Sequence, residues 1–416
     1  MERGDVTRAW LGAGRLLAIL ACLLACLPIG AIALAGVAHA HVKWFVTCEP
    51  SENPIPLQAV LTERFWLFSA LFMALFYVAC RAEQTAIGAV LTKFLDRATA
   101  FLRGRLDVLL RAVAAVSFSL LWVDGSVVLT PELKGNSLSL SAIQVLIPIF
   151  LVARSTLPAA AAGIVVLYGC GVASYGLFHM LDYPIFLGLA AYFALSITPN
   201  PKVRTFRTSC LRWSVALSLL WPAMEKFLYP GWITPIALAH PELTLGLDIA
   251  TVTTAAGVVE FGLAFAMLWT PLVRRLGALA LALLLFVATF DFGKMDAVGH
   301  LMVIAILLSV VADPGPDARW RPALAPVVSG TALLASIFLY AGIHTLYYGS
   351  SHAALAPIMS GTALLSVIAL YLSGAVHTLL QLVQRLGRRD VLAHHALMAR
   401  SQPESFFVSR RGVPVS

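Results

Sequence analysis

Long, nearly uncharged apolar stretches limit this sequence to the folds that a lipid bilayer allows. Windows of about 18 or more such residues recur along the chain, which is typical of membrane-spanning helices rather than of helices in a soluble core. Charged residues make up only 12% of the chain and hydrophobic residues 60%, whereas about a quarter of a soluble domain would be charged. The sequence therefore predicts an all-α, polytopic membrane protein in contact with the lipid bilayer.

The distribution of arginine and lysine predicts how the spans are oriented. Both residues gather at 199–210 and 313–325, while the loops at 125–138 and 229–246 have almost none. Because cytoplasmic loops carry an excess of these residues, we expect about twelve spans with both termini in the cytoplasm, unless the N-terminal segment is cleaved. The expected location is the inner (plasma) membrane of a bacterium. After residue 106 the expected spans lie at 107–123, 139–153, 156–175, 184–198, 211–228, 247–269, 276–292, 299–312, 326–347 and 357–379.

Residues 1–40 form either a cleavable signal peptide or the first transmembrane helix. The apolar run in this segment is longer than the usual signal core of about 7–15 residues, which favours a retained helix. It ends in Ala38-His39-Ala40, and this small-residue ending favours cleavage. The polar segment 41–64 is expected to be extracytoplasmic. Residues 65–106 are expected to hold a transmembrane helix and an amphipathic helix on the cytoplasmic surface.

The net charge and the cysteines argue against several functional classes. The formal net charge is +8, but the basic residues lie in loops rather than on one continuous face, so nucleic acid is not expected as a partner. The six cysteines lack the spacing that is typical of zinc sites. A disulfide between Cys48 and Cys170, near the oxidising side, is the one pairing that we consider. The sequence has no phosphate-binding glycine loop, nucleophile motif or haem-attachment motif.

Two internal similarities predict that the central helices form tandem units. Residues 109–122 resemble 210–221, and Phe-His-Met-Leu-Asp at 178–182 parallels Phe-Gly-Lys-Met-Asp at 292–296. Similarity at a fixed interval indicates duplication. We therefore divide the chain after residue 106 into a first four-helix unit, a basic cytoplasmic linker, a second four-helix unit, a cytoplasmic loop, a helical pair and a basic cytoplasmic tail, at 107–198, 199–210, 211–312, 313–325, 326–379 and 380–416.

A set of ionisable residues falls within or at the ends of the spans of the second unit: Glu225, Lys226, Glu260, Asp291, Lys294, Asp296 and His300. An ionisable group at mid-bilayer depth costs about 2.5–3.5 kcal/mol, so such groups are functional or closely paired. Helix geometry places most of the set in the outer leaflet, with Glu260 deepest.

The acidic members, Glu225, Glu260 and Asp291, are the candidates for catalytic proton exchange. The remaining members are candidates for substrate binding: Lys226, Lys294, Asp296 and His300. The alternative is structural, with Lys226 and Lys294 neutralising Glu225 and Asp291 and tying the helices together. The first unit has fewer charges, and we expect it to be a packing partner.

Two histidines raise the question of a metal. If cleavage follows Ala40, the mature chain begins with His41, whose amine and imidazole would chelate copper together with a second histidine on the outer face. A plain loop histidine is the alternative. His179 stands beside Met180 at a helix end, where a structural role is favoured because no ligand spacing accompanies it.

Four different short motifs lie along the second unit, at Glu225-Lys226-Phe227-Leu228, Glu260-Phe261-Gly262, 272–280 and Gly299-His300-Leu301. In these motifs residues 211–312 resemble the DoxX-like family of integral membrane proteins. The resemblance implies a four-helix bundle and, in some members, a small membrane subunit of quinone-linked complexes such as thiosulfate:quinone oxidoreductase. This chain departs from the family by duplicating the unit, which predicts two tandem DoxX-like four-helix bundles, and by adding helices at both ends.

Three functional hypotheses follow. In the first, the chain is a quinone-associated membrane subunit whose acidic cluster relays protons or positions a quinone headgroup, with membrane or periplasmic redox proteins as partners. In the second, the chain is a transporter of a small solute or metal ion, and the cluster lines its path. In the third, it is a non-catalytic membrane assembly subunit. A continuous polar path to the cytoplasm would favour transport, and the sequence has no ionisable group deep in the inner leaflet to provide one.

Overall fold

The computed structural model describes residues 42–349, with gaps at 47, 50, 126–127, 136–137 and 316–320. Within this part the fold is all-α, with fourteen α-helices and four short 3₁₀ helices. Several predictions lie outside the described residues: the signal peptide or first helix, the copper candidate His41, the last predicted span and the basic tail.

Six helices of the described part are long and apolar enough to cross a membrane, so the chain is a multi-pass membrane protein. They are α3 (Glu63–Glu83), α6 (Leu106–Val123), α8 (Leu157–Tyr175), α13 (Ile249–Ala266), α14 (Pro271–Ala312) and α15 (Ala325–Tyr348). Further predicted spans coincide with α7 (Leu138–Phe150), α10 (Pro184–Leu195) and α11 (Pro201–Leu228). Every span predicted between residues 65 and 347 thus corresponds to a helix or to half of one, and the total of about twelve spans remains a prediction.

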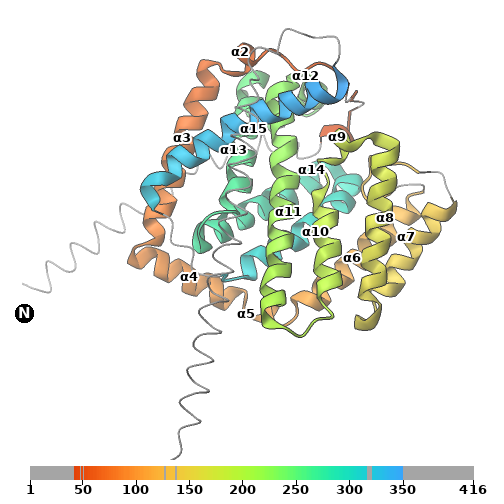
Figure 1. Ribbon diagram of the computed structural model, residues 1–416. Coiled ribbons are helices and arrows are strands. Elements are labelled where there is room, and N and C mark those ends of the chain that lie inside the picture. The colour runs from red at the N-terminus through yellow and green to blue at the C-terminus, as the bar shows by residue number, and fades with distance from the viewer. Residues whose placement is uncertain are drawn as a thin grey trace, which may run out of the picture. The chain divides into compact units, whose positions relative to one another are not determined.

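Short helices lie at the two ends of these spans (Figure 1). At one end are α2 (Leu57–Val60), α9 (Leu177–Met180) and α12 (Pro230–Ala239), and at the other α4 (Ala86–Ala98) and α5 (Ala100–Arg103). The helix α4 is the predicted amphipathic helix. It exposes Val90 and Phe94 beside Lys93 and Arg97, a mixture that suits a membrane surface. In contrast, α12 lies in a segment that the sequence predicted as a loop.

The helix α14 consists of two helices joined by a reversal at Gly293, whose φ is 72° and ψ −149°. A straight helix of 42 residues would be about 63 Å long. Instead its two ends meet, because Arg275 Nε donates to the carbonyl of Val311 over 2.7 Å. The helix α14 therefore supplies both spans predicted at 276–292 and 299–312.

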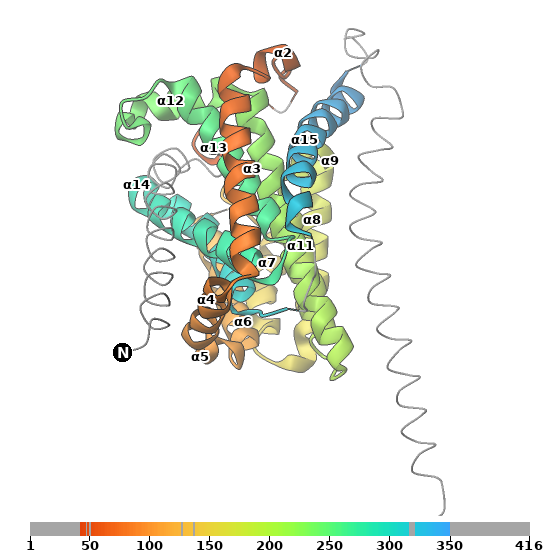
Figure 2. The same ribbon diagram turned by 90° about the vertical axis from the view of Figure 1, so that its left-hand side faces the viewer.

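Seven helices form a closed ring within the described part of the chain. In order of packing they are α6, α7, α8, α10, α11, α13 and α14, and α14 returns to pack on α6. The first predicted unit contributes the helices up to α10 and the second contributes the rest, so the two units share one ring. Outside it, α3 packs on α13, and α15 packs on α3 and α11 (Figure 2). The duplication itself remains a prediction.

The first described residues of the chain enter this ring. The short helix η1 (Val42–Trp44) places the Trp44 ring against the second half of α14. A Cβ at Gly299 would lie 2.2 Å from an atom of this ring, so the close approach requires glycine. The ring centroids of Trp44 and His300 are 4.8 Å apart. This packing brings the preceding residue, Lys43, among the charged groups of the ring.

Candidate functional site

Lys43 is the centre of a buried ionic group. Its Nζ lies 2.6 Å from Asp182 Oδ2 and 2.5 Å from Glu225 Oε1. The Tyr340 hydroxyl donates to the same Glu225 oxygen over 3.0 Å. The four residues come from η1, the turn between α9 and α10, α11 and α15. The group therefore joins the N-terminal segment to three separate parts of the fold.

One ammonium faces two carboxylates in this Lys43 group. Burial alone would lower the pKa of Lys43, but the nearby carboxylates of Asp182 and Glu225 outweigh burial and raise that pKa well above its usual value. Burial raises the pKa of Asp182, although the attraction of Lys43 opposes the shift. Lys43 thus stays charged, while Asp182 holds a proton more readily than a free carboxyl would. The group is suited to storing a proton.

A second ionic group lies beside the first. His179 Nε2 is 2.7 Å from Glu132 Oε1, and the Tyr183 hydroxyl donates to Glu132 Oε2. Burial alone would raise the pKa of Glu132, but the contacts with His179 and the charge of Lys43 hold it below its usual value. His179 is thus paired with a carboxylate, and its structural role remains a prediction.

Two further buried pairs come from the second unit. Lys226 Nζ on α11 donates to Glu260 Oε2 on α13 over 2.7 Å. His300 Nδ1 and Asp296 Oδ2 are 2.9 Å apart on the second half of α14. All four side chains are at most 6% exposed. Trp44, which packs on His300, connects the His300–Asp296 pair to the Lys43 group.

The structure divides the predicted site residues instead of gathering them in one cluster. Asp291 and Lys294 are exposed, and Lys294 pairs with Asp124 over 2.9 Å. The prediction that Glu225 and Asp291 belong to one acidic cluster is therefore wrong, because Glu225 is buried and Asp291 is exposed. The expected neutralisation of Glu225 by Lys226 is also wrong, because consecutive side chains of a helix point in different directions.

Sequence reasoning missed Lys43, Glu132 and Tyr340. It also treated the first unit as a packing partner, whereas that unit supplies Asp182 to the Lys43 group. One available signal was the internal similarity, which aligned Asp182 with Asp296. Both carboxyl groups are buried and paired. The internal similarity between the two units thus indicated buried charged residues as well as helix ends.

A cavity of about 430 Å³ lies between the starts of α3 and α13 and the end of α11. Its apolar lining includes Ile55, Val60 and Phe227, and its polar lining includes Lys226 and the exposed Arg64. Small-molecule sites typically have volumes of about 300–1,000 Å³. This outer cavity therefore has the size for a small ligand in contact with Lys226, which pairs with Glu260.

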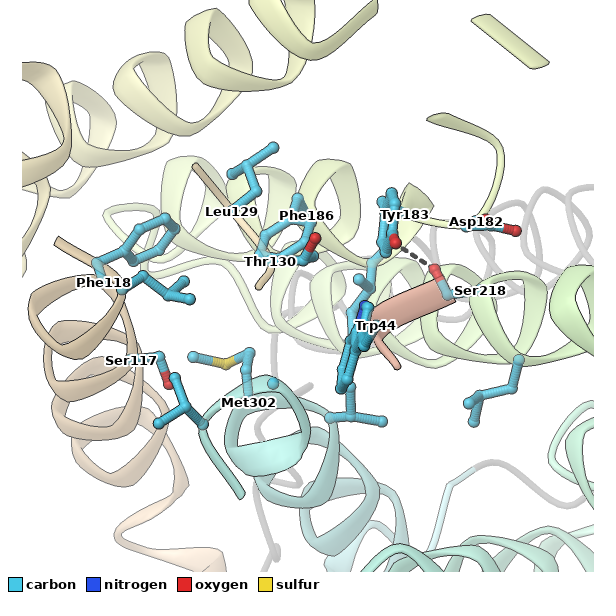
Figure 3. Close-up of a pocket in the computed structure, with 16 residues that line it drawn as sticks. Trp44, Ser117, Phe118, Leu129, Thr130, Asp182, Tyr183, Phe186, Ser218 and Met302 are labelled. Atoms are coloured by element: carbon cyan, nitrogen blue, oxygen red, sulfur yellow. Dashed lines mark hydrogen bonds between the residues drawn. The ribbon is translucent and has the colours of Figure 1, made fainter. Parts of the chain in front are cut away.

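A narrower cavity of about 30 Å³ lies inside the ring (Figure 3). Trp44, Phe118, Thr130 and Met302 line it, and the Asp182 carboxylate points away from it. Its volume suits about one water molecule. An organic substrate is therefore expected in the outer cavity and not in this one.

The disulfide considered between Cys48 and Cys170 is contradicted, because both residues are free thiols. Comparisons with models of protein families, with curated proteins and with solved structures gave no match. The DoxX-like resemblance thus rests on the short motifs of the second unit alone.

Proposed function

We propose that the chain is a membrane subunit of a quinone-linked redox system and that it binds the quinone headgroup in the outer cavity. The observation that carries this proposal is that one member of a buried ion pair, Lys226, lines a cavity of ligand size. Lys226, which lines the cavity of about 430 Å³, holds Glu260 at 2.7 Å. The same function is what the DoxX-like resemblance implies.

The lining of the cavity suits the two kinds of surface that a quinone presents. Phe227, Ile55 and Val60 offer apolar contacts to the faces of the ring. The Lys226 ammonium, which also donates to Glu260, would place its charge close to a carbonyl oxygen, and hydrogen bonds that involve a charged group are stronger than neutral ones. The rest of the quinone, an apolar chain, would lie in the surrounding lipid.

Reduction of a quinone to a quinol takes up two electrons and two protons. We assign only the protons to this chain, and the electrons to a membrane or periplasmic redox protein. Glu260 is buried next to the cavity-lining lysine, and His300 lies close enough to interact with its charge. The proton that Glu260 gives up to the quinone would then be replaced through the His300–Asp296 pair.

Photolabelling with an azidoquinone in lipid nanodiscs tests the binding step. We expect labelled peptides to include residues 55–64 or 250–254, which line the cavity. Removal of Lys226 alone would leave Glu260 buried without its cation, so the double variant Lys226→Met/Glu260→Gln, which removes both charges, is preferable. Loss of a charged hydrogen bond of about 1.5–3 kcal/mol predicts binding weaker by about tenfold or more.

The matched control is Lys294→Met, which removes an exposed lysine that does not line the cavity. It should bind quinone as the wild type does. Equal labelling of the wild type and the double variant would contradict the proposal. Unchanged function of a well-expressed Glu260→Gln variant would favour the assembly-subunit hypothesis instead.

A further inference from the structure

Three arginines converge on one aspartate at the end of the ring where α6 begins. Arg111 and Arg154 each lie 3.6 Å from Asp107 Oδ2, and Arg207 lies 3.6 Å from Asp107 Oδ1. They come from α6, from η2 (Arg154–Thr156) and from α11. Three positive charges around one negative charge leave two in excess. We call these four residues the Asp107 cluster.

Two guanidinium groups of the cluster are held in place but retain buried donors. Arg111 Nη1 donates to the carbonyl of Val152 over 3.1 Å, and Arg207 Nη1 donates to Ser196 Oγ over 2.5 Å. The ring of Tyr192 lies 4.6 Å from the Arg207 guanidinium. Among the described residues, neither Nε atom of these two arginines has a hydrogen-bond partner, and that of Arg111 is the atom that lies 3.6 Å from Asp107 Oδ2. Fixed guanidinium groups with unused donors are suited to an anion with several oxygens.

The surroundings of the Asp107 cluster favour an anion that carries an apolar chain. Val152 is 79% exposed, and Val108 and Ile149 are each 57% exposed. The Arg154 side chain is 70% exposed, so it is free to close on a ligand. The positive-inside rule places this end of the ring at the cytoplasmic surface. Basic pockets between spans on that side bind the headgroups of anionic lipids.

We propose that the Asp107 cluster binds the phosphate group of an anionic phospholipid of the cytoplasmic leaflet. The excess positive charge of the cluster attracts the single negative charge of the phosphodiester, the guanidinium groups of Arg111 and Arg207 bind its oxygens, and Arg154 covers it from outside. The acyl chains lie along the exposed apolar residues beside the cluster. This inference is independent of the proposed quinone site, which lies at the other end of the spans.

Native mass spectrometry of the full-length protein released from mixed nanodiscs tests this site. The nanodiscs contain equal amounts of phosphatidylglycerol and phosphatidylcholine, and the measured quantity is the ratio of the two lipids that stays bound. We expect the wild type to prefer phosphatidylglycerol and Arg154→Gln/Arg207→Gln to lower this preference about tenfold. Arg154→Gln alone, at an exposed position, should lower it in the same direction without affecting folding.

The matched control is Arg97→Gln, which removes one exposed cation of α4 outside the cluster and should leave the preference nearly unchanged. Equal retention of phosphatidylglycerol by the wild type and the double variant would overturn the proposal. A separate arm adds inorganic phosphate to lipid-free protein in detergent. If phosphate raised the melting temperature of the wild type but not of the double variant, while both proteins retained the same ratio of lipids, the lipid proposal would also be overturned. The site would then be assigned to a soluble anion.

Discussion

Lys43 is held between two buried carboxylates from distant parts of the chain, and no spacing rule connects it to either. The sequence offered Glu225 a cation in the adjacent Lys226, but neighbours on a helix do not face each other. Each of these two residues finds its partner on another element, Lys43 on η1 and Glu260 on α13. Hydropathy therefore identified Glu225, Lys226 and Glu260 as charges within spans, and packing decided how they pair.

Substitution of Lys43 by methionine should destabilise the protein by about 3–5 kcal/mol, because it leaves Asp182 and Glu225 buried without their cation. Because folding raises the pKa of Lys43 above its usual value of 10.5, the ion pairs contribute their full stabilisation at any pH below 10.5. This stabilisation is lost only when the pH rises through the higher pKa of the folded state. The measurement is thermal unfolding in detergent at pH 8. Lys294→Met, which breaks an exposed pair, should change stability by less than about 1 kcal/mol. Similar losses in both variants would contradict the assigned pairing.

At the scale of elements, α14 shows what a hydropathy pattern can and cannot predict. The pattern gave two spans at 276–292 and 299–312, and the structure has two antiparallel helices in this region. The reversal point was not predicted, because Gly293 is one of many glycines and its positive φ of 72° is a property of the folded backbone. The preceding Phe292 packs on Phe45 and His240, but at Gly293 itself the turn is made by the backbone conformation.

Alanine at Gly293 should cost about 1–3 kcal/mol, since the combination of φ 72° and ψ −149° is open almost only to glycine. A Cβ at this position would meet no atom within 4 Å, so the loss is attributable to the backbone. Gly231→Ala is the control, because it adds a Cβ in equally open space within the helix α12 and should be neutral or slightly stabilising. Thermal unfolding of the two variants gives the comparison. Equal stability would show that the reversal does not depend on glycine.

For the whole molecule, apolar periodicity predicted the helices but not which of them are neighbours. A span is apolar on the side that faces lipid and on the side that faces protein, so hydropathy alone does not distinguish the two faces. Three features of the fold depend on that distinction: the closed ring, the shared boundary between the two units, and the entry of η1 into the ring. Consequently the first unit was predicted to pack beside the charged site, whereas it supplies Asp182 to it.

The orientation of the ring can be tested with two exposed residues at its opposite ends. In a chain whose cysteines are replaced by serine, Lys294→Cys should react with a membrane-impermeant maleimide on intact spheroplasts, whereas Arg97→Cys should react only after permeabilisation. The positive-inside rule gives this expectation, and reaction of both variants in detergent controls for accessibility. The opposite labelling pattern would mean that the protein has the reverse orientation in the membrane. The outer cavity would then face the cytoplasm, and the Asp107 cluster would lie in the outer leaflet. The quinone and lipid proposals would then need partners on the other sides of the membrane, because each depends on the leaflet that its site faces.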